Sequence, residues 1–213
     1  MSFDFKRHLA ATERTVAETE REGRRAFDVS LSRSIAASRE DVWEAVTSAE
    51  RIPRWFLPIT GEFALGGRYQ IKGNAGGEIM ACEPLSRFAA TWEFAGDVSW
   101  VEVRLEDEGH GRVRLTLSHA QLHSPFWDHY GPGATGVGWE MGLVGLALHL
   151  EQPDAPLPDD EAFATSEEGK AWVAGSAEAW GRAAAAAGED TGVADLAARR
   201  TAAFYTGQEE PAE

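Results

Sequence analysis

The sequence predicts an α+β fold in which an antiparallel sheet curves around one long helix. From Phe27 to Gln121, apolar residues recur at every second position in runs separated by short turns, which is typical of half-buried antiparallel strands. From Gly138 to Leu150 the apolar residues repeat with a helical period instead. A one-layer sheet needs an apolar element on its concave face, and this helix is the one long enough to fill it.

The predicted helix has an unusual face. At 100° per residue, Gly138, Gly142 and Gly145 form a stripe between two apolar stripes, and His149 ends it, while Glu140 lies on the side expected to face water. A glycine inside a helix costs about 1 kcal/mol relative to alanine. The stripe therefore indicates either a close approach by another element, such as a bulky tryptophan, or a helix that walls a hollow. The residues alone leave both alternatives open.

The strands and their connections follow from the same patterns. The first strand is expected at Phe27–Ile35, with Arg33 on its apolar face, and Ser38 is expected to cap a short helix after it. Further strands are expected at Gly61–Ile71, with a bend at Gly66-Gly67, and at Glu78–Cys82, Arg87–Phe94, Trp100–Glu106 and Arg112–Gln121. The last of these places His119 on the same inward face as Leu117.

The chain is expected to divide into four segments. These are an N-terminal helical arm (1–26), the sheet-and-helix domain (27–150), a C-terminal helical extension (151–207) and a disordered tail (208–213). The arm, with its alternating charges, is expected to lie over the domain or against a twin subunit in a homodimer. A loop with a lid-like role is expected at 124–136. Ser166 and Thr191 are expected to cap two late helices, the second ending near Gly207.

Composition excludes several classes of protein. The 213 residues are 43% hydrophobic and include 8 Trp, which indicates a folded core. A net charge of −15 repels nucleic acid and anionic membranes, so we exclude DNA binding. No apolar run reaches the roughly 20 residues of a membrane span, so membrane insertion is not expected. The charged N-terminus and the single Cys82 favour a cytoplasmic protein.

Several motifs resemble the START/Bet v 1-like (SRPBCC) superfamily, and within it the branch named after the activator of Hsp90 ATPase. The resemblance covers roughly residues 27–150 and no single motif carries it alone. The motifs are the strand-to-helix junction Ile35–Trp43, then Arg54–Phe56, Leu65–Tyr69, Glu83–Arg87, Thr91–Glu93 and the Gly138-Trp139 pair that opens the leucine-rich helix. The resemblance implies a helix-grip fold, with a deep cavity between sheet and helix.

This resemblance does not supply an activity, because the superfamily ranges from lipid and hormone carriers to cyclases and co-chaperones. The ligand expected in the cavity is a small apolar or aromatic molecule, and no cofactor is expected. The residues expected to line the cavity are Arg33, Trp55, Phe56, Trp92, Phe94, His119, Trp139, Gly142, Leu143, Gly145 and Leu146.

His119 is the sharpest polar candidate, although a weak one for catalysis. Together with Arg33 it would orient an acidic or carbonyl-bearing ligand. The alternative is that Arg33 pairs with a local carboxylate and His119 bonds a backbone carbonyl at the sheet rim. His119, His123, Asp128 and His129 have a spacing that could suit a metal, but the segment that carries His123 and His129 is rich in glycine and proline, so no metal site is predicted.

The function expected from the sequence is therefore binding of a small molecule without catalysis. Two alternatives belong to other classes. One is an enzyme of the cyclase or dehydrase kind that uses His119 as general acid and base. The other is a stress-related protein-interaction module whose working surface is made by the extra helices.

Overall fold

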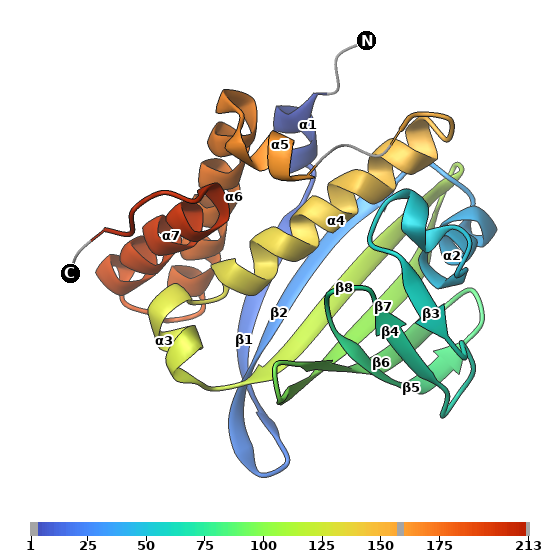
Figure 1. Cartoon of the computed structure of the whole chain (residues 1–213), viewed down its shortest axis with the longest axis horizontal. Helices are drawn as coiled ribbons and strands as arrows, with labels where there is room; N and C mark the ends of the chain where they lie inside the picture. The colour runs from blue at the N-terminus through green and yellow to red at the C-terminus, as the bar shows by residue number, and fades with distance from the viewer. Residues whose placement is uncertain (1–3, 157–159, 212–213) are drawn as a thin grey trace. The chain divides into compact units, whose positions relative to one another are not determined.

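The computed structural model describes residues 4–156 and 160–211 (Figure 1). Its contacts divide these residues into two compact units. The terminal unit comprises residues 4–31, 122–144 and 160–211, and the central unit comprises 32–121 and 145–156. One long helix and one strand belong partly to each unit, and a second strand has its last residue in the terminal unit, so the division follows contacts rather than the order of the chain.

Eight strands form one curved antiparallel sheet that does not close on itself, which confirms the predicted α+β fold (Figure 1). In spatial order they are β1 (Glu13–Arg21), β2 (Arg24–Ile35), β8 (Arg112–Leu122), β7 (Asp97–Gly109), β6 (Arg87–Phe94), β5 (Gly76–Glu83), β4 (Arg68–Ile71) and β3 (Ile59–Gly61). The order from β8 to β3 is that of a meander, in which each strand pairs with its neighbour along the chain.

In the central unit, local sequence signals determine where elements begin and end. Ser38 caps α2 (Arg39–Thr47), its hydroxyl accepting a 3.2 Å hydrogen bond from the Asp41 amide, as predicted. A 3₁₀ turn, η1 (Ile52–Arg54), follows. The segment Gly61–Ile71, expected as a strand with a bend at Gly66-Gly67, forms two strands, β3 and β4, on either side of that bend. The bend between them needs glycine: Gly66 has φ +77°, and a Cβ on Gly67 would lie 2.2 Å from a carbonyl oxygen.

The core of the central unit follows the period-two pattern of the strands. Along β8, Val113, Leu115, Leu117 and His119 are all buried, which confirms the predicted inward face. A second apolar cluster forms around Tyr69 of β4, joined by Ile71 and Ala90, with Phe56 and Trp92 packed against it. The inner side of this sheet therefore carries aromatic residues beside aliphatic ones.

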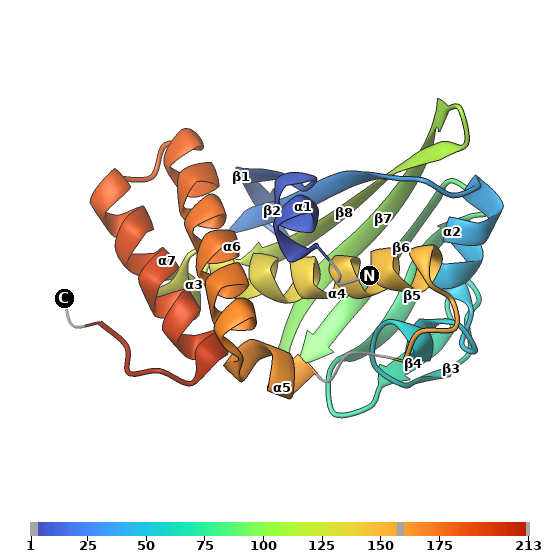
Figure 2. The ribbon, with the colours of Figure 1, turned by 90° about the horizontal axis from the view of Figure 1, so that it is seen from above.

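The terminal unit is mainly helical. It contains α1 (Phe5–Ala10), α3 (Pro125–Tyr130), α5 (Asp160–Thr165), α6 (Glu167–Ala186), α7 (Thr191–Thr206) and the first part of α4 (Gly133–Glu151). Helices α6 and α7 lie side by side (Figures 1 and 2). Ser166 caps α6 and left-handed Gly207 ends α7, both as predicted, but the cap of α7 is Asp190 rather than Thr191. Across the described ranges, no helix is long and apolar enough to cross a bilayer.

The prediction of a helical arm over residues 1–26 is wrong beyond α1. Residues 13–21 form β1, which makes a hairpin with β2 through Glu22 and Gly23. Both turn residues have positive φ, +54° and +72°, the geometry that two-residue hairpins favour. The alternating charges do not pair along a helix; Glu18 instead pairs with Arg25 across the hairpin.

The loop expected at 124–136 is also wrong, because α3 and the start of α4 occupy most of it. Ser124 caps α3 and Pro125 occupies its first turn, a helix-start signal within the sequence. The disordered tail expected at 208–213 differs as well. Glu210 accepts hydrogen bonds from Tyr130 and His129, at 2.5 and 2.7 Å, while residues 212–213 lie outside the described residues.

Glu140 of α4 is not water-facing, as the helical wheel suggested, but fully buried. Its carboxylate accepts a 3.0 Å hydrogen bond from Arg14 Nε and a second one from the same guanidinium, and Ser176 Oγ donates at 2.7 Å. Within the terminal unit, β1 and α6 thus cover the side of α4 that carries this residue. A buried carboxylate requires such partners, because otherwise nothing offsets the free energy that it loses when it leaves water.

We expect Glu140→Ala to lower the free energy of unfolding by about 3–5 kcal/mol, because it leaves the guanidinium of Arg14 in a buried position without its carboxylate. Urea unfolding followed by tryptophan fluorescence measures this change. The control is Glu178→Ala on α6, whose side chain is 71% exposed and whose loss should stay below about 1 kcal/mol. Equal losses in the two variants would contradict the buried-pair interpretation.

Candidate functional site

His119 lies on β8 opposite Val101 of β7, with its side chain buried. Its Nε2 is 2.8 Å from Ser99 Oγ, and the Ser99 hydroxyl donates a 3.1 Å hydrogen bond to the Trp92 carbonyl. Because that hydroxyl proton is already used, the serine oxygen accepts from Nε2–H of His119. The indole of Trp92 meets the imidazole edge-on, with ring centroids 6.0 Å apart.

Burial lowers the pKa of His119 to about 4. The imidazole is therefore neutral near pH 7, and its protonated form makes up only about one molecule in a thousand. This state agrees with a proton on Nε2 that is donated to Ser99. A general acid needs a pKa near the working pH, so His119 is poorly suited to that role.

Two other predicted aromatic residues lie in the same unit. Phe56 packs against the Tyr69 cluster together with Trp92, and its ring lies 5.5 Å from that of Trp55. Phe94, by contrast, is 54% exposed at the end of β6. The structure thus brings Trp92 and His119 together, with Phe56 in the same apolar cluster as Trp92, whereas Phe94 projects toward solvent.

Arg33 is buried but lies far from His119. Two side-chain hydrogen bonds of 2.9 Å, from Arg112 to Ser34 and from Arg114 to Ser32, indicate the register of β2 against β8. In that register Arg33 stands level with Val113, six residues from His119. Since a strand rises about 3.3 Å per residue, roughly 20 Å separates the two positions. The expected convergence of a cation and an imidazole on one ligand group is therefore wrong.

Two glycines of the α4 stripe, Gly138 and Gly145, lie in close contact with other elements. In the central unit, a Cβ on Gly145 would lie 2.5 Å from the Trp55 carbonyl oxygen. In the terminal unit, a Cβ on Gly138 would lie 2.6 Å from Tyr205 Oη. Of the two alternatives left open by the sequence, close approach therefore holds at these positions. Of the other α4 residues predicted to line the cavity, Gly142, Leu143 and Leu146 are buried and Trp139 is half-buried.

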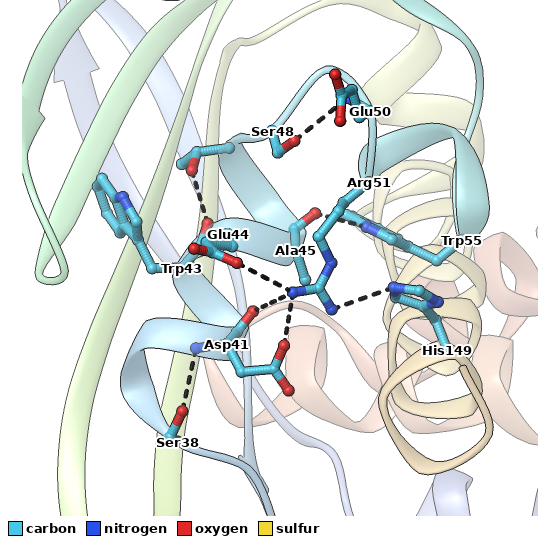
Figure 3. A network of polar contacts seen from close by, with 11 residues as sticks. Ser38, Asp41, Trp43, Glu44, Ala45, Ser48, Glu50, Arg51, Trp55 and His149 are labelled. Carbon is cyan, nitrogen blue, oxygen red and sulfur yellow. Dashed lines mark hydrogen bonds and ion pairs between the residues drawn. The ribbon is translucent and has the colours of Figure 1, made fainter. Parts of the chain in front are cut away.

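A polar network supports the segment that carries Trp55 (Figure 3). Arg51 Nη1 contacts the Asp41 carboxylate at 2.5 Å, and Arg51 Nη2 lies 3.2 Å from His149 Nε2. A guanidinium can only donate, so His149 accepts and is neutral; burial, and then Arg51, lower its pKa. The Trp55 indole donates to the Ala45 carbonyl at 2.8 Å. Sequence reasoning missed both Arg51 and Ser99, since neither stands in a recognisable motif.

The four residues weighed as metal ligands have separate partners. In the terminal unit, His123 pairs with Asp128 at 2.6 Å and His129 pairs with Glu210 at 2.7 Å. In the central unit, His119 bonds Ser99. Among residues 4–156 and 160–211, no three histidine, cysteine or acidic side chains are grouped as a metal site would require.

Comparisons with known proteins agree with this fold. Residues 36–151, more than half of the chain, match the family profile described as "Activator of Hsp90 ATPase homolog 1-like protein". The crystal structure of CalU16 from Micromonospora echinospora is 30% identical, covers 81% of this chain and 98% of its own, and has a TM-score of 0.67. For the solution structure of CalU16 these values are 31%, 83%, 97% and 0.70.

A more distant structure is DynU16, described as a putative protein in the dynemicin biosynthetic locus. It is 25% identical over 59% of this chain and 48% of its own, with a TM-score of 0.52, so this chain spans about half of its length. No curated protein sequence matches the chain. The likeness to CalU16 covers more of the chain than the family profile does, so it includes parts of the flanking segments.

We expect Gly145→Ala to lower the free energy of unfolding by about 1 kcal/mol or more, because its Cβ would press on the backbone at Trp55. If the glycine faced a hollow, alanine would raise stability by about 1 kcal/mol through its higher helix propensity. Chemical denaturation distinguishes the two signs. Gly175→Ala on α6 is the control, because there the Cβ would meet only the mobile end of the Leu9 side chain, so no loss is expected.

His119 should make stability depend on pH. With a pKa of about 4 in the folded state and 6.5 when unfolded, the unfolded chain binds more protons between these values. The contribution of His119 to the free energy of unfolding is therefore fully present above pH 6.5. As the pH drops to 4, this contribution falls by about 3 kcal/mol. Urea unfolding from pH 7 to 4 should show a smaller fall in His119→Gln than in the wild type. Identical pH dependence in both proteins would refute this assignment.

Proposed function

The chain belongs to the activator of Hsp90 ATPase homolog 1-like family, and on this premise we propose that it binds a small, uncharged apolar or aromatic molecule in an internal cavity beside His119. The observation that carries the proposal is the hydrogen bond between the buried His119 and the half-buried Ser99, set edge-on against Trp92. Ligand pockets combine apolar and aromatic walls with a few fixed polar groups, and these three residues supply both.

The charge state of this pair narrows the ligand class. His119 is neutral at pH 7, and Arg33 stands about 20 Å along the sheet from it. A charged ligand group beside His119 would lose its hydration without gaining an ionic partner from either residue. The proposed ligand is therefore neutral, in place of the acidic ligand that a converging arginine and histidine would have favoured.

Binding without catalysis also fits the chemistry of His119 better than the alternative of a cyclase or dehydrase. General acid catalysis would need the imidazolium, which is scarce when the pKa is about 4. A small-molecule ligand also agrees with the description of DynU16, a similar protein, as a putative protein in a biosynthetic locus.

The test uses two probes that differ by one charge: neutral N-phenyl-1-naphthylamine and its anionic 8-sulfonate. We expect fluorescence titration to show binding of the neutral probe that is at least about tenfold tighter than that of the sulfonate, because burying the sulfonate costs hydration. Equal affinities, or no binding of the neutral probe, would overturn the proposal.

Two substitutions on the same strand localise the site. Trp92→Leu should weaken binding of the neutral probe about tenfold, because it removes the aromatic edge beside His119. Phe94→Leu is the matched control, since Phe94 is exposed two residues further along β6, and it should change the affinity less than about twofold. Circular dichroism verifies that both variants are folded. An equal effect of the two substitutions would remove the binding site from this part of the sheet.

A further inference from the structure

We propose that a pocket in the terminal unit, separate from the site proposed beside His119, binds a small organic amine that carries an aromatic ring. The pocket has a volume of about 410 Å³, within the range of ligand-binding pockets. Three parts of the unit form it: the β1–β2 hairpin, α3 with the residues after it, and the turn between α6 and α7. Most of its lining comes from outside residues 36–151, so the proposal does not depend on the family's own domain or on the site beside His119.

The pocket exists because small residues stand where α6 ends and α7 begins. Ala184, Ala187, Gly188, Ala194 and Ala197 line this wall. Gly188 has φ +105°, and a Cβ placed on it would meet no atom within 4 Å. Larger side chains on this wall would project into the space, so the hollow is a direct consequence of its composition.

The wall formed by β2 and α3 is aromatic. The rings of Phe27 and Trp127 are stacked, with centroids 4.0 Å apart and planes within 5° of parallel. Both side chains are buried, which fixes their positions. A flat ring that enters the pocket would therefore meet a preformed aromatic surface.

The charged groups of the lining are three carboxylates, Glu18, Asp128 and Glu189, against one guanidinium, Arg25. Arg25 is held by Glu18 through two hydrogen bonds of 3.0 and 2.9 Å, and it lies over the Phe27 ring at 4.9 Å. The lining therefore keeps two carboxylates, Asp128 and Glu189, in excess after this pair is formed. Asp128 also pairs with His123, which is outside the lining, and Glu189 accepts from the Asp190 amide. A net charge of −15 on the chain adds to the attraction for a cation.

The two helix ends at the pocket also favour a positively charged ligand. The carbonyl end of the 20-residue α6 lies at this wall, and a helix C-terminus attracts positive charge. The amide end of α7 would attract an anion, but Asp190 already accepts from the Gly192 and Val193 amides at 2.9 and 3.1 Å. Arg25 is also paired, so both groups that could hold an anion are engaged. The last carbonyls of α6 accept the backbone amides of residues 187–189, so the preference for a cation rests on the net negative charge of the lining.

The experiment uses tryptamine and its uncharged analogue tryptophol, which have the same ring and differ at the amine. Isothermal titration calorimetry on the full chain should show binding of tryptamine that is at least about fivefold tighter than that of tryptophol and that weakens with added salt. Tryptamine should not displace N-phenyl-1-naphthylamine, which separates this pocket from the site beside His119. Failure of either proposed site would then leave the other measurable.

Neighbouring alanines provide a matched pair of variants. Ala187→Phe should fill the pocket and weaken tryptamine binding at least about tenfold. Ala186→Phe changes the adjacent residue, which is also exposed but does not line the pocket, and should leave the affinity within about twofold. Because both positions are exposed at the end of α6, both variants should fold, as thermal unfolding verifies.

A second pair tests the charge. Glu189→Gln should weaken tryptamine binding about threefold or more without changing that of tryptophol, whereas Glu178→Gln, an exposed acid of α6 outside the lining, should have no such effect. The proposal is overturned if tryptophol binds as tightly as tryptamine, if the two members of either pair behave alike, or if millimolar tryptamine does not bind.

Discussion

The terminal unit depends on one buried charge. The Glu140 carboxylate has no access to water, and hydrogen bonds from Arg14 and Ser176 replace its hydration in the folded state. These partners come from β1 and α6, segments on opposite sides of α4 in the sequence. The hairpin, α4 and α6 are therefore bound to one another by polar contacts as well as by apolar packing. This constraint explains why residues outside the family's characteristic domain form a compact unit with part of α4.

Close packing at the glycines of α4 also joins segments that are distant in the sequence, through smaller contacts. Gly138 admits Tyr205 of α7, and Gly145 admits the backbone at Trp55. The bare stripe of the helix left close approach and empty space both open, and backbone and side chains of other elements reach these two positions. The polar features of the central unit that suit a ligand are instead on the sheet, where Ser99 and His119 face each other from β7 and β8.

The sequence could predict the structural features that depend on residues close to one another in the chain. Alternation predicted β6 to the residue and placed His119 inward on β8, and the hydroxyls of Ser38 and Ser166 indicated where helices begin. The misreadings came from distant contacts. From the sequence alone, the charges around Glu18 suit a helix and a hairpin equally well. Only their pairing with β2 distinguishes the two. The burial of Glu140 depends on a residue 126 positions away, and the separation of Arg33 from His119 depends on strand register.

The same long-range contact has a consequence for synthesis on the ribosome. A chain emerges N-terminus first, so the β1–β2 hairpin appears long before the helices that complete its unit. Arg14 must wait for Glu140, and that carboxylate must wait a further 36 residues for the Ser176 hydroxyl. The central meander, whose partners follow each other along the chain, can assemble while translation continues. The terminal unit closes only when α6 has left the exit tunnel, so a nascent chain halted before that point holds an acidic side chain that still needs water.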